Sequence, residues 1–287
     1  MRAFLLVLLL AACASPPKPA APEDAEMRRS ARVGRVAFNL ERPDEAVTQY
    51  RAALSRAQAR DDLPAIADLG YDLAVAQLRA NDPKATLATA TSIRAELARR
   101  RAPDLPELDL AEATALYRTG APAQSDALAA SVQRAGDPEA AARASFLRGL
   151  IADAAGDTAG LQSALASLGA PADAETQADA AELSARLKLR QGDPAGARAD
   201  AQRAAVLRRD LPDYRGLARA LALEAQAARQ AGDQSAAADL YLRAGRSAAA
   251  QGDTDQARMW LRQAGAASDP AIRQAAATAL AALTSGN

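Results

Sequence analysis

Residues 241–264 read YLRAGRSAAAQGDTDQARMWLRQA. Small and apolar residues recur at helical spacing on both sides of Gly252-Asp253. Gly adopts the left-handed conformation that ends one helix, and Asp accepts hydrogen bonds from the free amides that begin the next. The stretch therefore predicts two helices joined by a short turn.

Turns of this kind recur along the chain, often with Pro at the first helical position, where its missing N–H is not needed. They are Arg42-Pro43, Asn81-Asp82-Pro83, Gly120-Ala121-Pro122, Gly156-Asp157, Gly192-Asp193-Pro194, Gly232-Asp233 and Gly252-Asp253. From Asn81 onward the turns lie 39, 36, 36, 40 and 20 residues apart. Periods of this size are typical of arrays of helical hairpins. The last gap predicts one helix shared by two overlapping hairpins.

The composition agrees with helices and narrows the range of functions. The chain is rich in Ala, the best helix former, and aromatic residues make up only 3%. Its 35 basic and 35 acidic residues balance, so no net field favours nucleic acid or a membrane surface. There is no His and one Cys, which removes the commonest general base and any intramolecular disulfide. We therefore expect no enzyme, cofactor, metal site or nucleic-acid partner.

The N-terminus predicts export. A short basic start is followed by an apolar run from Ala3 to Leu10, which is too short to span a bilayer and is typical of a signal peptide. The next residues, Leu10-Ala11-Ala12-Cys13, resemble the lipobox of bacterial lipoproteins, in which the Cys is acylated. The resemblance implies lipidation of Cys13 at the outer membrane, facing the periplasm. Cleavage at an A-x-A site around Cys13, releasing a soluble secreted or periplasmic protein, is the alternative.

The expected domain organisation follows from these segments. Residues 1–12 form the signal peptide, and residues 13–26 form the lipidated Cys and a Pro-rich linker. A polyproline-like linker rises ~3.1 Å per residue, so it reaches roughly 35–40 Å from the membrane. Residues 27–287 form one continuous helical repeat domain, in which Leu168–Ala172 is a loop between units.

The terminal repeats resemble tetratricopeptide (TPR) repeats. The last unit carries Tyr241, Gly245, Ala257, Leu261, Ala264 and Pro270 at TPR spacing around Gly252. The first and sixth units match through Gly34, Ala46, Tyr50 and Ala53, and through Ala225, Ala237, Tyr241 and Ala244. The middle units depart from the pattern, with Thr86, Ile93, Ser125, Val132, Leu161 and Leu168 in small-residue positions. The expected fold is thus an all-α, right-handed α-solenoid of stacked helical hairpins, TPR-like at both ends.

The TPR register places a row of arginines and aromatic residues on the concave face. Positions four apart lie on one side of a helix, and Arg with Tyr is a frequent pairing in protein interfaces. The candidate partner-binding residues are Arg35, Arg79, Arg118, Arg186, Arg190, Arg229, Arg246, Tyr71, Tyr117 and Phe146. Arg binds carboxylates through two parallel hydrogen bonds, so we expect an acidic or C-terminal segment of a partner.

A simpler explanation of the same arginines is possible. A basic residue near a helix C-terminus is favoured by the helix dipole, and Asp68, Asp153, Glu182 and Asp239 could neutralise the row. Trp260, Tyr50 and Tyr241 are expected in the core, and Arg99-Arg100-Arg101 on a solvated face.

The sequence favours a lipid-anchored scaffold or adaptor that binds envelope proteins during envelope assembly or maintenance. The alternative is a helical binding module for a small ligand of a periplasmic transport system. That module would need a closed pocket near Tyr71, Tyr117 or Phe146.

Overall fold

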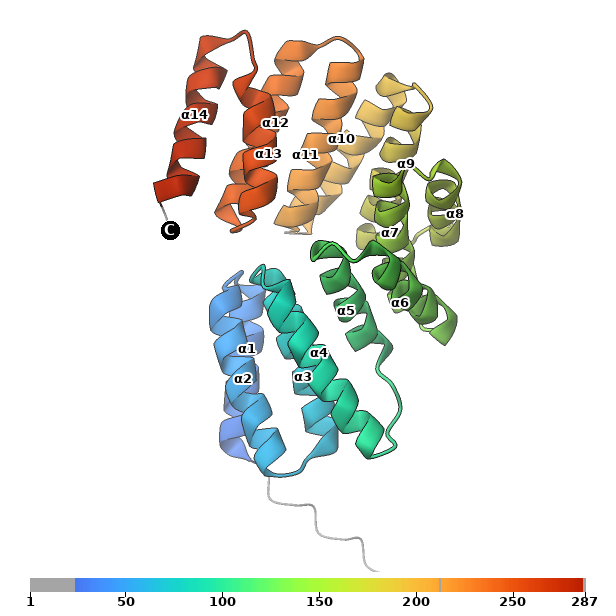
Figure 1. Ribbon diagram of the computed structural model, residues 1–287, viewed down its shortest axis with the longest axis vertical. Coiled ribbons are helices and arrows are strands. Elements are labelled where there is room, and N and C mark those ends of the chain that lie inside the picture. Colours follow the sequence, from blue (N-terminus) through green and yellow to red (C-terminus); the bar gives the residue numbers. More distant parts are fainter. Residues whose placement is uncertain (1–23, 212, 286–287) are drawn as a thin grey trace, which may run out of the picture.

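The computed structural model describes residues 24–211 and 213–285, and in these residues the chain forms fourteen α-helices and no strand (Figure 1). The predicted signal peptide, Cys13 and most of the predicted tether lie outside the described residues. The helices are α1 (Ala25–Asn39), α2 (Pro43–Ala59), α3 (Leu63–Arg79), α4 (Pro83–Arg99), α5 (Pro106–Arg118), α6 (Pro122–Ala135), α7 (Pro138–Ala155), α8 (Thr158–Leu168), α9 (Ala174–Arg190), α10 (Pro194–Asp210), α11 (Tyr214–Gln230), α12 (Gln234–Ala250), α13 (Thr254–Gly265) and α14 (Pro270–Ser285).

Successive helices pack against each other along the whole series, so the all-α solenoid of stacked hairpins is confirmed. Alternate helices also touch, in the order α3 with α5, α5 with α7, α7 with α9 and α9 with α11. At the C-terminal end the alternate helices in contact are α12 and α14. α12 therefore serves the last unit as α11 serves the one before it, as the 20-residue gap predicted.

The same type of short turn joins most of the successive helices. Before most helices an Asp accepts a hydrogen bond from the backbone amide three residues on, as Asp62 does from Ala65 at 3.2 Å and Asp193 from Gly196 at 2.9 Å. Such a cap stabilises a helix by about 1 kcal/mol. The residue before the cap adopts a left-handed conformation, which Gly provides at 192, 232 and 252. Asp61 and Asn81 adopt it without Gly, at φ values of 55° and 61°.

The non-Gly turns explain the length of the repeat. The turn at 60–62 joins two hairpins and has the same geometry as the turns within hairpins, with Asp61 in the left-handed position that Gly takes at 192, 232 and 252. Helices of 17 residues separated by three-residue turns give 20 residues for each helix and 40 for each hairpin. The sequence analysis did not single out the turn at 60–62, because Asp61 takes the left-handed position without a Gly.

The middle units are hairpins like the others, despite their atypical residues. Thr86 and Ser125 are fully buried, and each hydroxyl donates to a backbone oxygen of the neighbouring helix: Thr86 to Ala74 at 3.3 Å and Ser125 to Ala113 at 2.7 Å. Leu161 is also fully buried. A small hydroxyl thus replaces Ala at the close approach of two helices while satisfying its own hydrogen bond.

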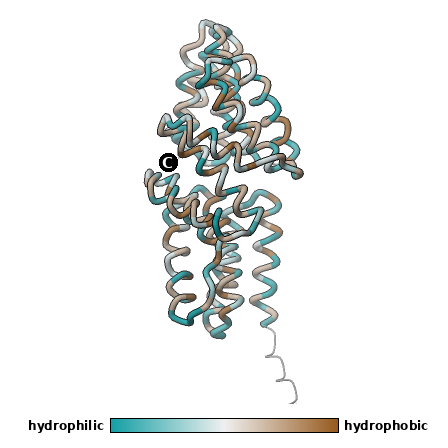
Figure 2. The backbone as a smooth tube through the Cα atoms, turned by 90° about the vertical axis from the view of Figure 1, so that its right-hand side faces the viewer, coloured by the Kyte–Doolittle hydropathy of each residue, from teal (hydrophilic) through white to brown (hydrophobic). Residues whose placement is uncertain are grey.

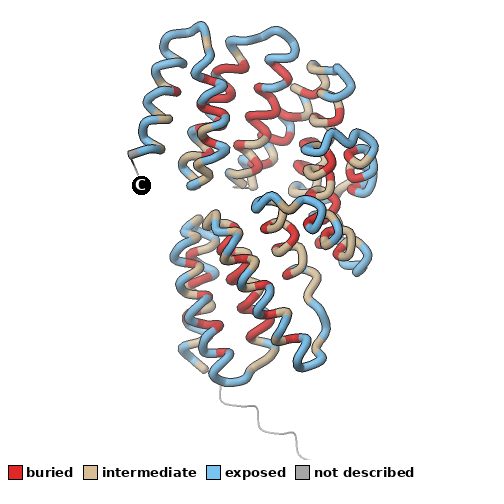
Figure 3. Tube along the Cα trace, in the orientation of Figure 1, coloured by how far each residue is buried: buried red, intermediate tan, exposed pale blue. Residues whose placement is uncertain are grey.

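The core is divided into separate clusters along the solenoid (Figure 3). The two largest lie at the ends, over α1–α5 and over α11–α14. Tyr50, Tyr241 and Trp260 are buried in them, as expected. Figure 2 shows hydrophobic and hydrophilic residues mixed along the helices. Among the described helices, none is both long and apolar enough to cross a bilayer.

The solenoid curls until its two halves touch, with α1–α5 below and α9–α14 above in Figure 1. Asn81, in the turn between α3 and α4, donates to the backbone oxygen of Gly252 at 3.1 Å. From α11, Arg215 donates to the backbone oxygens of Arg79 at 3.3 Å and Gln251 at 3.2 Å. These three hydrogen bonds join turns that lie more than half the chain apart.

Gly245 tests the close packing of the terminal hairpin. A Cβ at Gly245 would lie 2.6 Å from Cγ and 3.1 Å from the backbone nitrogen of Leu261. Although Ala is the better helix former by about 1 kcal/mol, overpacking costs about 1–3 kcal/mol. We expect Gly245→Ala to lower the midpoint of urea denaturation.

Gly265→Ala is the matched control, because a Cβ there meets nothing within 4 Å. It should raise stability by about 0.4–1 kcal/mol. Equal effects of the two substitutions would contradict the packing assigned to Gly245.

Candidate interaction site

The predicted arginines do not form one open row. Arg186 and Arg190 both bind Asp153 of α7, with N–O distances of 2.7 Å. Arg186 also binds Glu182 at 2.9 Å. The neutralising role considered for Asp153 and Glu182 is therefore present in the structure. These two arginines link α9 to α7 and have little freedom to bind a partner.

Glu182 is the centre of a buried charge cluster. Its side chain is fully buried, and three arginines surround it: Arg186, Arg219 at 3.0 Å and Arg208 at 3.4 Å. Burial alone raises the pKa of Glu182, but the charges of Arg219, Arg186 and Arg208 outweigh it and hold the pKa at about 2. Glu182 is consequently ionised at neutral pH.

Arg208 extends this cluster through the core. Only 3% of the residue is exposed, and it pairs with Asp179 as well as with Asp213 at 2.8 Å. Burial and then the neighbouring Glu182 charge raise the pKa of Asp179 to about 7, although Arg208 acts in the opposite direction. The Phe146 ring lies under the guanidinium groups of Arg208 and Arg219, at 5.5 and 5.6 Å. Phe146, predicted for partner binding, is thus partly buried and packs against these two arginines.

A second group of arginines gathers where the two halves of the solenoid meet. We call Arg79, Arg118, Arg215 and Arg219 the inner arginine cluster. Arg118, at the end of α5, donates to the backbone oxygen of Leu78 at 2.7 Å, and Arg215 of α11 donates to the next carbonyl group, Arg79. The C-terminal end of α3, which is the negative end of its helix dipole, is capped by cations from both halves.

Arg118 differs from the other members of the inner arginine cluster. Arg79 pairs with Glu41 at 3.1 Å, Arg215 with Asp253 at 3.3 Å, and Arg219 with Glu182. Among the described residues, no carboxylate forms an ion pair with Arg118.

The surroundings of Arg118 also leave its charge uncompensated. Removal from bulk water, followed by the charges of Arg215 and Arg219, lowers the pKa of Arg118 to about 10. The side chain is nevertheless exposed. It stays protonated at neutral pH, and within the described residues its charge is offset only by the carbonyl group of Leu78 and by the more distant carboxylate of Asp253.

The other predicted residues lie apart from this cluster. Arg35 hydrogen-bonds the Tyr50 side chain, and Arg229 donates to Gln263 at 2.9 Å and lies over the Tyr241 ring. Arg246 is exposed on α12. Tyr117 is partly buried against the core of α5–α7. The structure thus brings Arg79 and Arg118 together, joins Arg186 and Arg190 at Asp153, and separates the other predicted residues.

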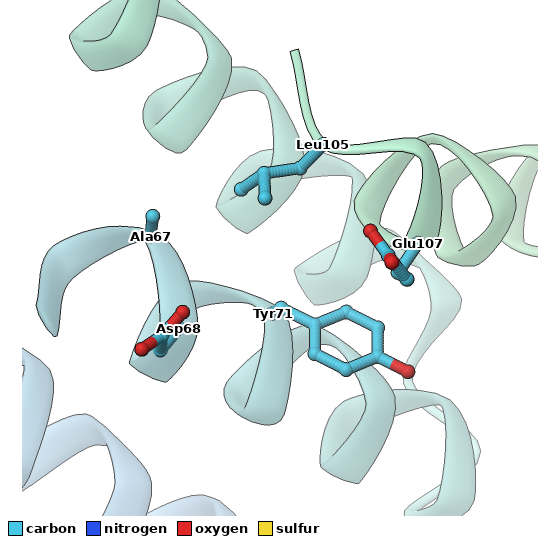
Figure 4. A pocket seen from close by; sticks show the side chains of 5 residues that line it. All are labelled: Ala67, Asp68, Tyr71, Leu105 and Glu107. Atoms are coloured by element: carbon cyan, nitrogen blue, oxygen red, sulfur yellow. The ribbon is translucent and has the colours of Figure 1, made fainter. Parts of the chain in front are cut away.

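Tyr71 lines a small pocket between α3 and the start of α5, with Ala67, Asp68, Leu105 and Glu107 (Figure 4). The pocket has a volume of about 240 Å³, and Asp68 and Glu107 are exposed at its rim. Typical small-ligand sites enclose roughly 300–1,000 Å³ and bury most of the ligand. A second pocket, of about 360 Å³, is lined by Leu189, Gln226, Arg229 and Gln230. Neither gives the enclosed apolar walls that a small-ligand site requires.

Sequence reasoning missed Asn81, Arg208, Arg215 and Arg219 as site residues. Arg215 and Arg219 stand four apart in the first turns of α11, where the helix dipole disfavours cations. That unfavourable placement was an available signal that both side chains have partners elsewhere. No grouping of three or more His, Cys, Asp or Glu residues suited to a metal occurs in the described part of the chain.

Comparisons with known proteins agree on the fold. No protein-family profile matches the chain, and no curated protein does. A tetratricopeptide repeat protein from Parabacteroides merdae ATCC 43184 is similar in structure, with a TM-score of 0.52 and 14% identity, over 90% of this chain and 100% of that one. At this identity the similarity shows a TPR-like fold and nothing of the partner.

Two further solved structures match more loosely. One is the TPR2AB domain of yeast Sti1 in complex with pHSP90, with a TM-score of 0.32, 16% identity, and coverage of 83% of this chain and 96% of that one. The other is a TPR repeats protein from Bacteroides fragilis NCTC 9343, with a TM-score of 0.32, 14% identity, and coverage of 90% and 100%.

Glu182→Gln tests the buried charge cluster. The substitution keeps the shape but leaves Arg186, Arg208 and Arg219 without their shared carboxylate. Breaking a buried ion pair costs about 3–5 kcal/mol, so we expect a loss of that order in the free energy of unfolding at pH 7. Glu139→Gln, at a carboxylate that is 79% exposed, should change stability by less than about 0.5 kcal/mol.

The pH profile separates a charge effect from a packing effect. The pKa of Glu182 is lowered from 4.5 to about 2, so its contribution is complete above pH 4.5 and is lost as the pH falls toward 2. The difference in stability between the wild-type chain and Glu182→Gln should shrink over that window. A difference that stays constant with pH would show that Glu182 stabilises the fold by packing alone.

Proposed function

We propose that the chain is a lipid-anchored scaffold that binds a partner protein through the inner arginine cluster, in assembly or maintenance of a bacterial envelope. The observation that carries the proposal is Arg118, an exposed cation flanked by Arg215 and Arg219 and unpaired with any described carboxylate. A carboxylate from outside the chain would complete the set of ion pairs found at the other three arginines.

The structural setting favours a peptide segment as the occupant. Arg118 lies where α3, α5 and α11 meet, so an acidic segment bound there would contact both halves of the solenoid. The pocket beside Tyr71 is small and open, which argues against a buried small ligand. A C-terminal carboxylate or an acidic side chain of a partner therefore fits the site best.

The location of the protein rests on the sequence of its N-terminus. We infer that Cys13 is lipidated and that the solenoid faces the periplasm from the outer membrane. We expect no catalytic activity, since the sequence contains no His and the charged groups of the interior are paired with one another.

Arg118→Glu tests the binding site. Crosslinking in native envelopes and mass spectrometry identify the partner, and its affinity for the purified full chain is then measured. Reversal of the Arg118 charge should weaken binding by about tenfold or more, because the partner carboxylate would face a like charge. Arg262→Glu, at an exposed position of α13, is the matched control and should bind normally. Equal affinities of the two variants would rule out the inner arginine cluster as the site.

Cys13→Ser tests the anchor. The wild-type chain should incorporate labelled palmitate and fractionate with the outer membrane, and the variant should do neither. Release of an unlabelled wild-type chain into the periplasm would instead support cleavage at the A-x-A site around Cys13.

A further inference from the structure

The first helix carries a surface that the proposed partner site does not use. We define the α1 outer face as Arg28, Arg29, Arg32, Arg35, Val36 and Leu40, all of which are exposed. The opposite side of α1 packs against α2 through Ser30, Gly34 and Ala37. Residues three and four apart share a helix side, so the arginines and the two apolar side chains form one surface.

Four of the six residues of the α1 outer face are arginines, and Arg28 among them also interacts elsewhere. Arg29 and Arg32 form no ion pair with any residue that the structure describes, and Arg35 contacts the Tyr50 side chain near Asp72. The chain as a whole has no net charge, so this is a local concentration of positive charge.

The nearby carboxylates are mostly engaged elsewhere. Asp24 binds Arg56 of α2 at 2.9 Å, and Glu41 binds Arg79 of α3 at 3.1 Å. Glu26 remains, in the first turn of α1, where the helix dipole favours an acidic residue.

The other end of the solenoid shows that capping does not require this charge. A terminal helix of a repeat array needs a polar outer surface. The C-terminal helix α14 satisfies this need with one charged residue, Arg273, which donates to the backbone oxygens of Ala267 and Ser268. The basic surface therefore belongs to the N-terminal end specifically.

Two apolar side chains complete the surface. Val36 is 52% exposed and Leu40 is 58% exposed, and they stand one helical turn apart beside the arginines. Basic and apolar residues on one exposed helix side are typical of helices that lie at a membrane interface, where the cations bind lipid phosphates and the apolar groups enter the headgroup layer.

We propose that the α1 outer face binds the anionic headgroups of a phospholipid leaflet. Two observations select this occupant: the surface has the opposite charge, and α1 follows directly on the segment that leads to Cys13. The orientation of the solenoid in the envelope thus rests on the proposed anchor, whereas the affinity of α1 for anionic lipid does not. A lipid chain and a basic surface together hold a protein at a membrane far better than either alone.

The expected strength of vesicle binding follows from the number of basic residues that lie near the leaflet. A basic residue near an anionic leaflet raises membrane partitioning by roughly fivefold, and added salt screens the attraction within a Debye length of about 10 Å at 0.1 M. Reversing two charges of the α1 outer face should therefore reduce vesicle binding by at least roughly tenfold.

Vesicle cosedimentation of the full chain tests the proposal. The Cys13→Ser chain, which lacks the acylation site, is mixed with phosphatidylcholine vesicles with and without phosphatidylglycerol. We expect salt-sensitive binding only when phosphatidylglycerol is present. Adding Arg29→Glu and Arg32→Glu should reduce this binding by at least roughly tenfold. Arg203→Glu with Arg209→Glu, at exposed positions of α10, makes the same charge change and should leave binding within about twofold.

The outcomes separate this surface from the anchor and from a protein site. Equal binding to both kinds of vesicle, or equal loss in both double variants, overturns the proposal. Absence of vesicle binding together with an acidic protein crosslinked at Arg32 overturns it in favour of a protein partner. Palmitate labelling of Cys13 is measured separately. Absence of the label would contradict the lipidation proposal, whereas the vesicle experiment would still test lipid binding by the α1 outer face.

Discussion

The three-residue turn with its Asp cap is the constraint on which the rest of the structure depends. Most turns close one helix with a left-handed residue and begin the next with an Asp that accepts from a backbone amide, as at Asn81-Asp82 and Gly192-Asp193. Where the turns are short and alike, as along α2–α4 and α9–α12, helices of 17 residues stack with a regular offset. The offset accumulates along the chain until the turn at Asn81 reaches the turn at Gly252.

Contact between the two halves of the solenoid changes which inner arginines can bind a partner. In an open solenoid the inner arginines would face solvent along the whole groove. Here Arg215 spans from α11 to the carbonyl groups that end α3 and α12, and Glu182 holds Arg186, Arg208 and Arg219 inside. Buried ion pairs thus link α7, α9 and α11 beside the smaller apolar clusters of the middle units. Arg118 is left as the exposed cation of the cluster, so the interaction site is narrower than a row of arginines.

The sequence predicted the helices, most hairpins and the buried aromatic residues, because these follow from local rules of capping, propensity and spacing. It predicted Arg79 and Arg118 as site residues because both end helices of one type. It grouped Arg186 and Arg190 with them, although Asp153 comes from another hairpin and neutralises both. It missed Arg215 and Arg219, since their placement near the start of α11 indicates that they have partners but does not identify these partners, which lie far away in the chain.

Local sequence predicts the repeating helical hairpin: the Ala-rich helices, the residues at which they begin and end, and the small residues, such as Gly245, at which two helices meet. These features depend on neighbours within one or two helices. The folded chain determines which cations are neutralised, where the two halves touch, and that the α1 outer face is exposed among the described residues. The physical reason is that curvature is a sum of many small packing offsets, and charges from distant repeats meet only after that sum is complete.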